Sequence, residues 1–182
     1  PWELLAATEW LSESLETRLD GTVSDGATIE GDVVVEPGAT VKAGVTIEGP
    51  AYIGEDATVG PNAYIRGATA VGAGAKVGHA VEIKNSVLLR DATVGHLSYV
   101  GDSILGCGVN FGAGTTVANL RHDDEPVELT VKGDRVSTGR RKFGVVVGDN
   151  AKTGINTSLN AGVVLGTEMT TTPGEVLTRD RR

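Results

Sequence analysis

The sequence predicts an all-β fold, a parallel β-helix built from hexapeptide repeats. β-Branched aliphatic residues recur at every sixth position, which matches neither the three- and four-residue steps of a helix nor the alternation of a long strand. Six residues are enough for a very short strand and a turn, and repeating such a module produces the hexapeptide β-helix. The repeat positions are Val23, Ile29, Val35, Val41, Ile47, Ile53, Val59, Ile65, Val71, Val77 and Ile83.

Two further observations favour this fold. A small or medium residue, most often Ala, stands two positions before each repeat residue from Ile29 onward, where a corner between short strands needs one. Glycine makes up 26 of the 182 residues, about twice the usual share of roughly 7%, and glycine adopts positive φ in tight turns without strain. Aromatic residues are only 4% of the chain, so we expect a core of Val, Ile, Leu and Ala.

The segment before the repeat, residues 1–20, is rich in helix formers. Its Leu and Trp residues lie on or near one stripe, so we expect an amphipathic helix or connector that caps the open end of the coils. The main coils then occupy residues 21–120, and their register shortens by one residue before Leu88 and again before Leu105.

After residue 120 the repeat lapses and then returns. Residues 121–146 are polar and too long for a turn, so we interpret them as a loop insertion with room for a hairpin of its own. The period resumes more weakly over residues 147–178, which we expect to form the final coils. Residues 179–182 are a basic tail that we expect to be disordered.

Charge and composition argue against several classes of function. A net charge of −8 argues against a general surface for nucleic acid or anionic membrane. No run of about 18 apolar residues is present, so we expect no membrane span, and no signal peptide is visible. Cys107 is the one cysteine and has no partner for an intrachain disulfide, which favours the reducing cytoplasm.

Stacking of coils converts sequence spacing into geometry. Residues one coil apart lie about 4.8 Å apart, one strand spacing, and a coil has 18 residues, or 17 where the register shortens. The pairs expected to stack are Arg66 with Lys84, Glu82 with Tyr99, and His79 with His96. Stacked cations repel each other unless solvent screens them or an anion such as phosphate lies between them. One edge therefore carries either a functional cluster or ordinary solvated polar residues: Arg66, Glu82, Lys84, His96, Tyr99 and Asn119.

Several motifs point to a known family. The stretch GHLSYVGDSILGCGVNFGAGTTVANL, from residue 95, resembles the acetyltransferase domain of the bacterial bifunctional N-acetylglucosamine-1-phosphate uridylyltransferase/glucosamine-1-phosphate acetyltransferase. ANLR and the later GRRK are more similar to archaeal sugar-1-phosphate nucleotidylyltransferases that carry the same domain. VEIKNS and YIRG match further segments, and the spacings agree without gaps from Arg66 to Asn119. The resemblance implies a left-handed helix, against the general preference for right-handed crossovers.

The resemblance also implies an activity. It implies an acetyl-CoA-dependent N-acetyltransferase that acts on glucosamine-1-phosphate, galactosamine-1-phosphate or both in nucleotide-sugar biosynthesis, with no metal needed for acetyl transfer. His96 matches the catalytic base, and Arg66 and Lys84 match the residues that hold the sugar phosphate. The remaining matches line the amino-sugar pocket: Glu82, Tyr99, Asn110 and Asn119.

Two departures from the family pattern stand out. A tyrosine of the bacterial motif is Leu120 here, and lysines often found a few residues later are replaced by acids such as Glu125 and Glu128. These changes leave the choice between glucosamine and galactosamine open. The glycine-rich loop of the uridylyltransferase half is also absent, so we expect the chain to be the C-terminal part of a bifunctional nucleotidylyltransferase.

Two other functions remain open. One is a non-catalytic β-helix that oligomerises or regulates a sugar nucleotidyltransferase, although such a scaffold needs no His, Tyr, Lys and Arg at these spacings. The other is a γ-type carbonic anhydrase, which shares the fold and needs three well-placed imidazoles for zinc. The available histidines are His79, His96 and His122.

Physical chemistry adds three expectations. Imidazole has an unperturbed pKa of about 6.5, so His96 can accept the proton that the acceptor amine loses.

A site on an outer edge is shallow and wet, so we expect a homotrimer in which a neighbouring subunit supplies a second wall and Asn110. The insertion is rich in cations, which suit the phosphates of coenzyme A. These cations are Lys132, Arg135, Arg140, Arg141 and Lys142, of which the GRRK residues Arg140, Arg141 and Lys142 are the main candidates.

Overall fold

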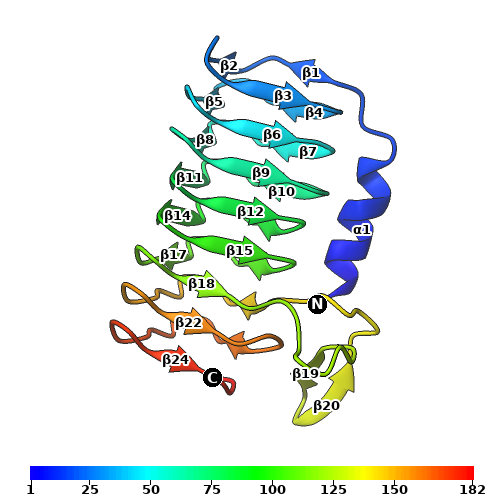
Figure 1. Ribbon diagram of the computed structural model, residues 1–182, viewed down its shortest axis with the longest axis vertical. Coiled ribbons are helices and arrows are strands. Elements are labelled where there is room, and N and C mark those ends of the chain that lie inside the picture. The colour runs from blue at the N-terminus through cyan, green and yellow to red at the C-terminus, as the bar shows by residue number, and fades with distance from the viewer.

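Each module of the repeat folds into a strand of two to four residues followed by a turn. The computed structural model describes residues 1–182, except for the side chain of Ser12. Successive modules turn onto three different faces, and modules one coil apart pair in parallel, which builds a three-sided solenoid (Figure 1). In Figure 1 the strands nearest the viewer, from β3 (Thr28–Glu30) at the top to β24 (Val176–Leu177) at the bottom, run from left to right. The chain descends from coil to coil, so the solenoid is left-handed, as the resemblance implied.

The three faces are parallel sheets in register. Face 1 consists of β1 (Arg18–Leu19), β4 (Val33–Val35), β7 (Ala51–Ile53), β10 (Thr69–Val71), β13 (Val87–Leu88), β16 (Ile104–Leu105), β21 (Val146–Val147) and β23 (Val164–Leu165). Face 2 consists of β2 (Thr22–Val23), β5 (Thr40–Val41), β8 (Thr58–Val59), β11 (Lys76–His79), β14 (Thr93–His96) and β17 (Asn110–Phe111). Face 3 consists of β3 (Thr28–Glu30), β6 (Thr46–Glu48), β9 (Tyr64–Arg66), β12 (Glu82–Lys84), β15 (Tyr99–Gly101), β18 (Thr116–Val117), β22 (Ser158–Leu159) and β24 (Val176–Leu177).

The core is the column of inward repeat residues, as the six-residue period predicted. Ile65, Ile83 and Val100 pair in register on face 3 and are fully buried. Val23 and Ile29 stay partly exposed, because their coil has a neighbouring coil on one side only. Burial of aliphatic side chains stabilises by roughly 25 cal/mol for each Å² removed from water, so this continuous column is the main source of stability.

The helix α1 (Glu3–Ser12) lies along the side of the solenoid (Figure 1), so the expectation that it caps the open end is wrong. The reason is an apolar patch on the outer surface of face 1. Val87 and Ile104 point outward there, and Leu5 of the helix buries against them together with Phe143 of the insertion. Most of the expected apolar stripe remains exposed, including Trp10.

The insertion leaves the coils after β18 and contains an antiparallel hairpin, β19 (Glu128–Val131) and β20 (Asp134–Ser137). Its two turn residues, Lys132 and Gly133, both have positive φ, as a tight two-residue hairpin turn requires. The chain then rejoins the stack, where β21 pairs with β16. The amide of Phe143 donates to the carbonyl oxygen of Asn119 at 3.0 Å, so the two ends of the insertion lie side by side.

The basic tail is ordered, so the expectation of disorder is wrong. Arg181 forms a parallel bridge with Leu165, and its carbonyl oxygen accepts a hydrogen bond from the amide of Gly166 at 2.7 Å. Its guanidinium forms an ion pair with Glu175. The tail therefore continues face 1 past β23 and closes the C-terminal end of the stack.

This ion pair should make the last coil sensitive to acid. Hydrogen bonds, above all from Arg181, lower the pKa of Glu175 from 4.5 to about 2. Because the folded value lies below the unfolded one, the contribution is complete above about pH 4.5 and is lost as the pH falls towards about 2. We expect hydrogen-exchange protection of residues 172–178, corrected for intrinsic rates, to fall over this range while that of β12 is kept. Constant protection of the last coil would contradict the prediction.

Candidate active site

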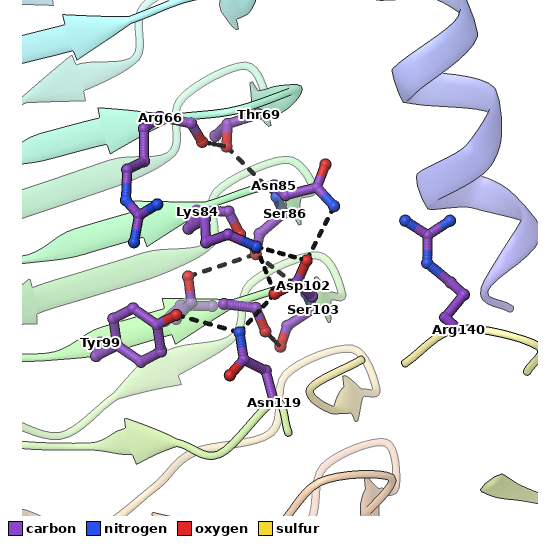
Figure 2. A network of polar contacts seen from close by, with 12 residues as sticks. Arg66, Thr69, Lys84, Asn85, Ser86, Tyr99, Asp102, Ser103, Asn119 and Arg140 are labelled. Atoms are coloured by element: carbon purple, nitrogen blue, oxygen red, sulfur yellow. Dashed lines mark hydrogen bonds and ion pairs between the residues drawn. The ribbon is translucent and has the colours of Figure 1, made fainter. Parts of the chain in front are cut away.

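The expected stacking of the polar residues is confirmed. On face 3, Lys84 pairs with Arg66 and Glu82 pairs with Tyr99, and on face 2 His79 pairs with His96. Figure 2 shows the face 3 residues together on neighbouring strands.

Each of the two stacked cations has a carboxylate of its own, a pairing that residue spacing alone does not predict. Arg66 donates from Nε to Glu82 Oε1 at 2.9 Å, and its guanidinium lies 5.7 Å from the ring centre of Tyr64. The hydrogen bond with Glu82 raises the pKa of Arg66. The repulsion between stacked cations is thus already offset inside the chain.

The carboxylate beside Lys84 is Asp102, which was not among the predicted site residues. Its side chain is only 3% exposed, and that of Lys84 is 18% exposed. The Lys84 ammonium donates to Oδ1 at 2.9 Å and to Oδ2 at 2.8 Å. Asn85 donates to Oδ1 at 3.0 Å and Asn119 donates to Oδ2 at 2.5 Å. Figure 2 shows these three side chains converging on the buried carboxylate.

The turn geometry explains why Asp102 is present. The corners after β9, β12 and β15 each use a residue with positive φ, which is Gly67, Asn85 and Asp102 in turn, with φ of 66°, 45° and 51°. Asn and Asp tolerate this region better than other side chains. In the sequence, Asp102 therefore looked like an ordinary turn residue, and only the stacking shows that its side chain turns back under Lys84.

Tyr99 and Asn119 meet over the same corner. Asn119 Nδ2 donates to the Tyr99 hydroxyl at 3.2 Å. Gly101 packs against both, and a β-carbon there would crowd the Tyr99 hydroxyl and lie 2.7 Å from Asn119 Nδ2, so another residue would displace these two side-chain tips. Partial burial, followed by the charges of Asp102 and Glu82, raises the pKa of Tyr99. The phenol thus keeps its proton and remains a hydrogen-bond donor near neutral pH.

His96 lies at the opposite end of the face 3 strand from the Lys84 column. It ends β14 at the corner that leads into β15, and its side chain is exposed. His79, one coil earlier, lies 3.4 Å from Asn62 through Nδ1. The structure therefore places His96 near the start of β15, where Tyr99 is, and across the face from Lys84.

The other predicted residues lie elsewhere. Asn110 begins β17 on face 2 and is exposed, which agrees with its expected separation from the Lys84 column. Arg140 forms an ion pair with Glu9 of α1, Arg141 forms one with Asp124, and Lys142 is exposed. The hydrogen bond from Arg140 lowers the pKa of Glu9. The guanidinium of Arg140 thus attaches the insertion to the helix, which argues against its predicted role in coenzyme binding.

A cleft of about 830 Å³ lies between the last coils and the insertion, and its lining includes Ala118 and Leu120, the chain neighbours of Asn119. One wall is formed by the last coils, where Ala118 follows β18 at the same end of face 3 as Lys84. The other wall is the insertion. Residues on the two walls include Ala118, Asn160, Gly162, Arg121, His122 and Arg135.

Among the described side chains, no group of three or more His, Cys, Asp or Glu residues is arranged to hold a metal ion. Within the same part of the chain, no helix is long and apolar enough to cross a membrane.

The fold and the cluster define a class, the hexapeptide-repeat parallel β-helices with a polar site on one edge. Within that class, the chain belongs to the family described as the GMPPB C-terminal domain, whose model matches residues 47–143.

Named relatives confirm the resemblance found in the motifs. The chain is 54% identical over 166 residues to the bifunctional protein GlmU of Methanococcus maripaludis strain C7, covering 91% of this chain and 40% of the relative. It is 43% identical over 181 residues to the bifunctional sugar-1-phosphate nucleotidylyltransferase/acetyltransferase of Sulfurisphaera tokodaii, covering 99% of this chain and 45% of the relative. The chain thus spans less than half the length of these relatives.

A solved structure supports the fold alone. A Bacillus cereus protein, provisionally named an acetyltransferase, matches with a TM-score of 0.50 and 18% identity, covering 85% of this chain and 70% of that one.

Proposed function

We propose that this chain is an acetyl-CoA-dependent N-acetyltransferase for an amino-sugar 1-phosphate, and that it works as the C-terminal part of a bifunctional nucleotidylyltransferase. The observation that carries the proposal is the cluster on face 3. Arg66 and Lys84 lie one strand spacing apart, and Tyr99 and Asn119 lie beside them with polar groups turned to the same edge. A scaffold that only oligomerised would not need buried polar contacts at this edge. The activity named in the relatives supports the same reading.

The chemistry assigns a role to each side chain. Arg66 and Lys84 bind the phosphate of the sugar, since guanidinium and ammonium groups form charge-assisted hydrogen bonds with phosphate oxygens. The sugar amine attacks the thioester carbonyl carbon, the C–S bond breaks, and coenzyme A leaves as a thiolate, which then takes up a proton to become the thiol. The amine must lose a proton in this step, and His96 accepts it as general base. Glu82, Tyr99 and Asn119 contact the sugar ring and determine whether the acceptor is glucosamine or galactosamine.

A panel assay tests the function. Glucosamine-1-phosphate, galactosamine-1-phosphate and the unphosphorylated amino sugars are incubated with acetyl-CoA, and thiol release is followed. We expect release well above the buffer rate for at least one phosphorylated sugar and much weaker release for its unphosphorylated form, because Arg66 and Lys84 then lose their ligand. Release at the buffer rate with every sugar would favour the non-catalytic reading.

The proposed coenzyme site is the cleft between the last coils and the insertion. Acetyl-CoA carries a pyrophosphate and a 3′-phosphate, and Arg141 and Lys142 are the exposed cations of the GRRK segment. Arg121 and Arg135 line the cleft itself. The cleft begins beside Asn119, so the pantetheine arm of the coenzyme would have to cross face 3 to bring the thioester to the sugar amine near His96.

Charge reversal tests the role of the insertion. The variant Arg141→Glu/Lys142→Glu is expected to raise KM for acetyl-CoA about tenfold and to leave KM for the sugar phosphate within about twofold. The reason is that the change puts two negative charges in place of two positive ones next to the cleft, where Lys142 is bridged to the lining residue Leu120. A matched control is Lys76→Glu on face 2, which changes an exposed cation on β11. Equal effects on both KM values, or none on acetyl-CoA, would contradict this role.

We further propose a homotrimer in the reducing cytoplasm, where Cys107 stays a free thiol. His96, Leu97 and Asn110 are all exposed in the single chain, and Leu97 is 65% exposed. An apolar side chain next to a catalytic base favours cover by another subunit, and Asn110 on face 2 would then reach the site of a neighbour. Sedimentation of the active protein is expected to give a trimer. A fully active monomer would contradict the shared site.

A further inference from the structure

Asp102 is the buried centre of the polar cluster, and its carboxylate is saturated. Asp102 is 2% exposed, and a carboxylate has about four lone-pair sites. All four are engaged by N–H donors: two contacts from Lys84, one from Asn85 and one from Asn119. A carboxylate in this state has no capacity left for a ligand, so its role is to hold its partners.

The backbone beneath Asp102 is fixed from both sides. Its amide donates to the carbonyl oxygen of Lys84 at 2.8 Å, and its own carbonyl oxygen accepts from the amide of Gly144 at 2.8 Å. Buried Ser86 and Ser103 join the same corners, since Ser103 N donates to Ser86 Oγ at 3.0 Å. The carboxylate therefore projects from a rigid corner that cannot follow its partners if they move.

The contacts determine which way the amide of Asn119 points. An ionised carboxylate only accepts hydrogen bonds, so the group of Asn119 that faces Asp102 must be the NH₂. Its nitrogen contacts both Asp102 and the hydroxyl of Tyr99, which uses both amide hydrogens. The Oδ1 oxygen is left as the group that Asn119 can offer a ligand. For the same reason the Tyr99 hydroxyl, which accepts from Asn119, is left with its O–H to donate.

We propose that Asp102 is a positioning residue that sets the hydrogen-bonding pattern of the site: it fixes the Lys84 ammonium and turns Asn119 so that an acceptor oxygen faces the ligand. The group bound opposite Asn119 must then be a donor, a hydroxyl or an amine of the sugar, and the group opposite Tyr99 must be an acceptor. That this ligand is a sugar rests on the proposed function, whereas the orientation of the Asn119 and Tyr99 side chains is independent of it.

The variant Asp102→Asn tests the proposal at constant shape. Asn tolerates the positive φ of this corner, but it has a single acceptor oxygen and brings an NH₂ of its own, so it cannot hold all three partners. We expect KM for the sugar phosphate to rise by about 10- to 100-fold, the range for losing hydrogen bonds to a charged group, while KM for acetyl-CoA stays within about twofold. The matched control is Asp91→Asn, the same change at an exposed corner with φ of 59°, where neither KM should change.

A double-mutant cycle separates positioning from stability. If Asp102 acts through Lys84 and Asn119, Asp102→Asn should cost less in a Lys84→Met background and in an Asn119→Ala background than in the wild type. Effects on KM that simply multiply in both backgrounds, or a lower melting temperature with an unchanged KM for the sugar phosphate, would overturn the proposal and leave Asp102 a structural residue.

A measurement on the unmodified protein covers the case in which Asp102→Asn fails to fold. In ¹⁵N-labelled protein the side-chain amide hydrogens of Asn119 should exchange with water at least about tenfold more slowly than those of exposed Asn160. Equal exchange would overturn the proposal. If the wild type releases no thiol with any amino-sugar phosphate, the proposed function fails, and this exchange comparison still decides the role of Asp102.

Discussion

A His96→Ala protein is expected to fold normally and to transfer acetyl groups about 10²- to 10⁴-fold more slowly than the wild type, measured as kcat. A positioned general base contributes about this factor. The fold should tolerate the change because the side chain is exposed at a corner between β14 and β15. Circular dichroism and thermal melting establish that the variant is folded, and thiol release at saturating acetyl-CoA and sugar phosphate gives kcat.

His79→Ala is the matched control for this prediction. His79 has the same residue type, pairs with His96 one coil earlier and is also exposed, but it is not the residue that the family motif marks as the base. We expect its kcat to stay within about twofold of the wild type. A His96→Ala protein with near-wild-type kcat would show that another group, or water, accepts the proton.

The second large effect concerns stability. Ile83→Ala is expected to lower the free energy of unfolding by about 2–5 kcal/mol, the range for truncating a buried large aliphatic residue. Ile83 is fully buried between Ile65 and Val100 in the core column. The cavity cannot be closed by a shift of the neighbouring coils without breaking the register of face 3. Urea unfolding followed by circular dichroism measures the change.

Val176→Ala is the control for the core variant. It removes aliphatic groups from a face 3 strand too, but Val176 is 64% exposed, and surface substitutions usually change stability by no more than about 0.5 kcal/mol. A loss of similar size in both variants would mean that the inward column is not what holds the coils together.

Much of the fold could be predicted because the repeat is a property of the sequence. The positions every sixth residue from Val35 to Ile83 are buried on the inner side of the coils, and even the two shortened modules place Leu88 and Leu105 correctly in the core. The placement of α1 could not be predicted in the same way. It depends on outward residues such as Val87 and Ile104, which lie outside the repeat positions and find their partner far away in the sequence.

The site shows the same division. Pairings such as Arg66 with Lys84 follow from counting residues, because coils stack in register. The carboxylate partners of these cations cannot be predicted by counting, because the spacing of Cα atoms does not determine the direction of a side chain. Asp102 lies at a corner whose positive φ favours Gly, Asn or Asp, so the turn alone explains an aspartate there and the sequence gives no sign of a second role. Arg140 was predicted from charge alone, and the ion pair with Glu9 lay outside what composition can show.

The two ends of the insertion are joined by backbone pairing at the point where the chain leaves and rejoins the coils. Leu120 pairs with Lys142 in an antiparallel bridge, and the backbone of Phe143 is bonded to that of Asn119. The pairing of the coils therefore does not depend on the number of residues between these two ends. The hairpin between these two ends can therefore vary in length, and a foreign peptide grafted in its place would have both of its ends fixed beside Asn119.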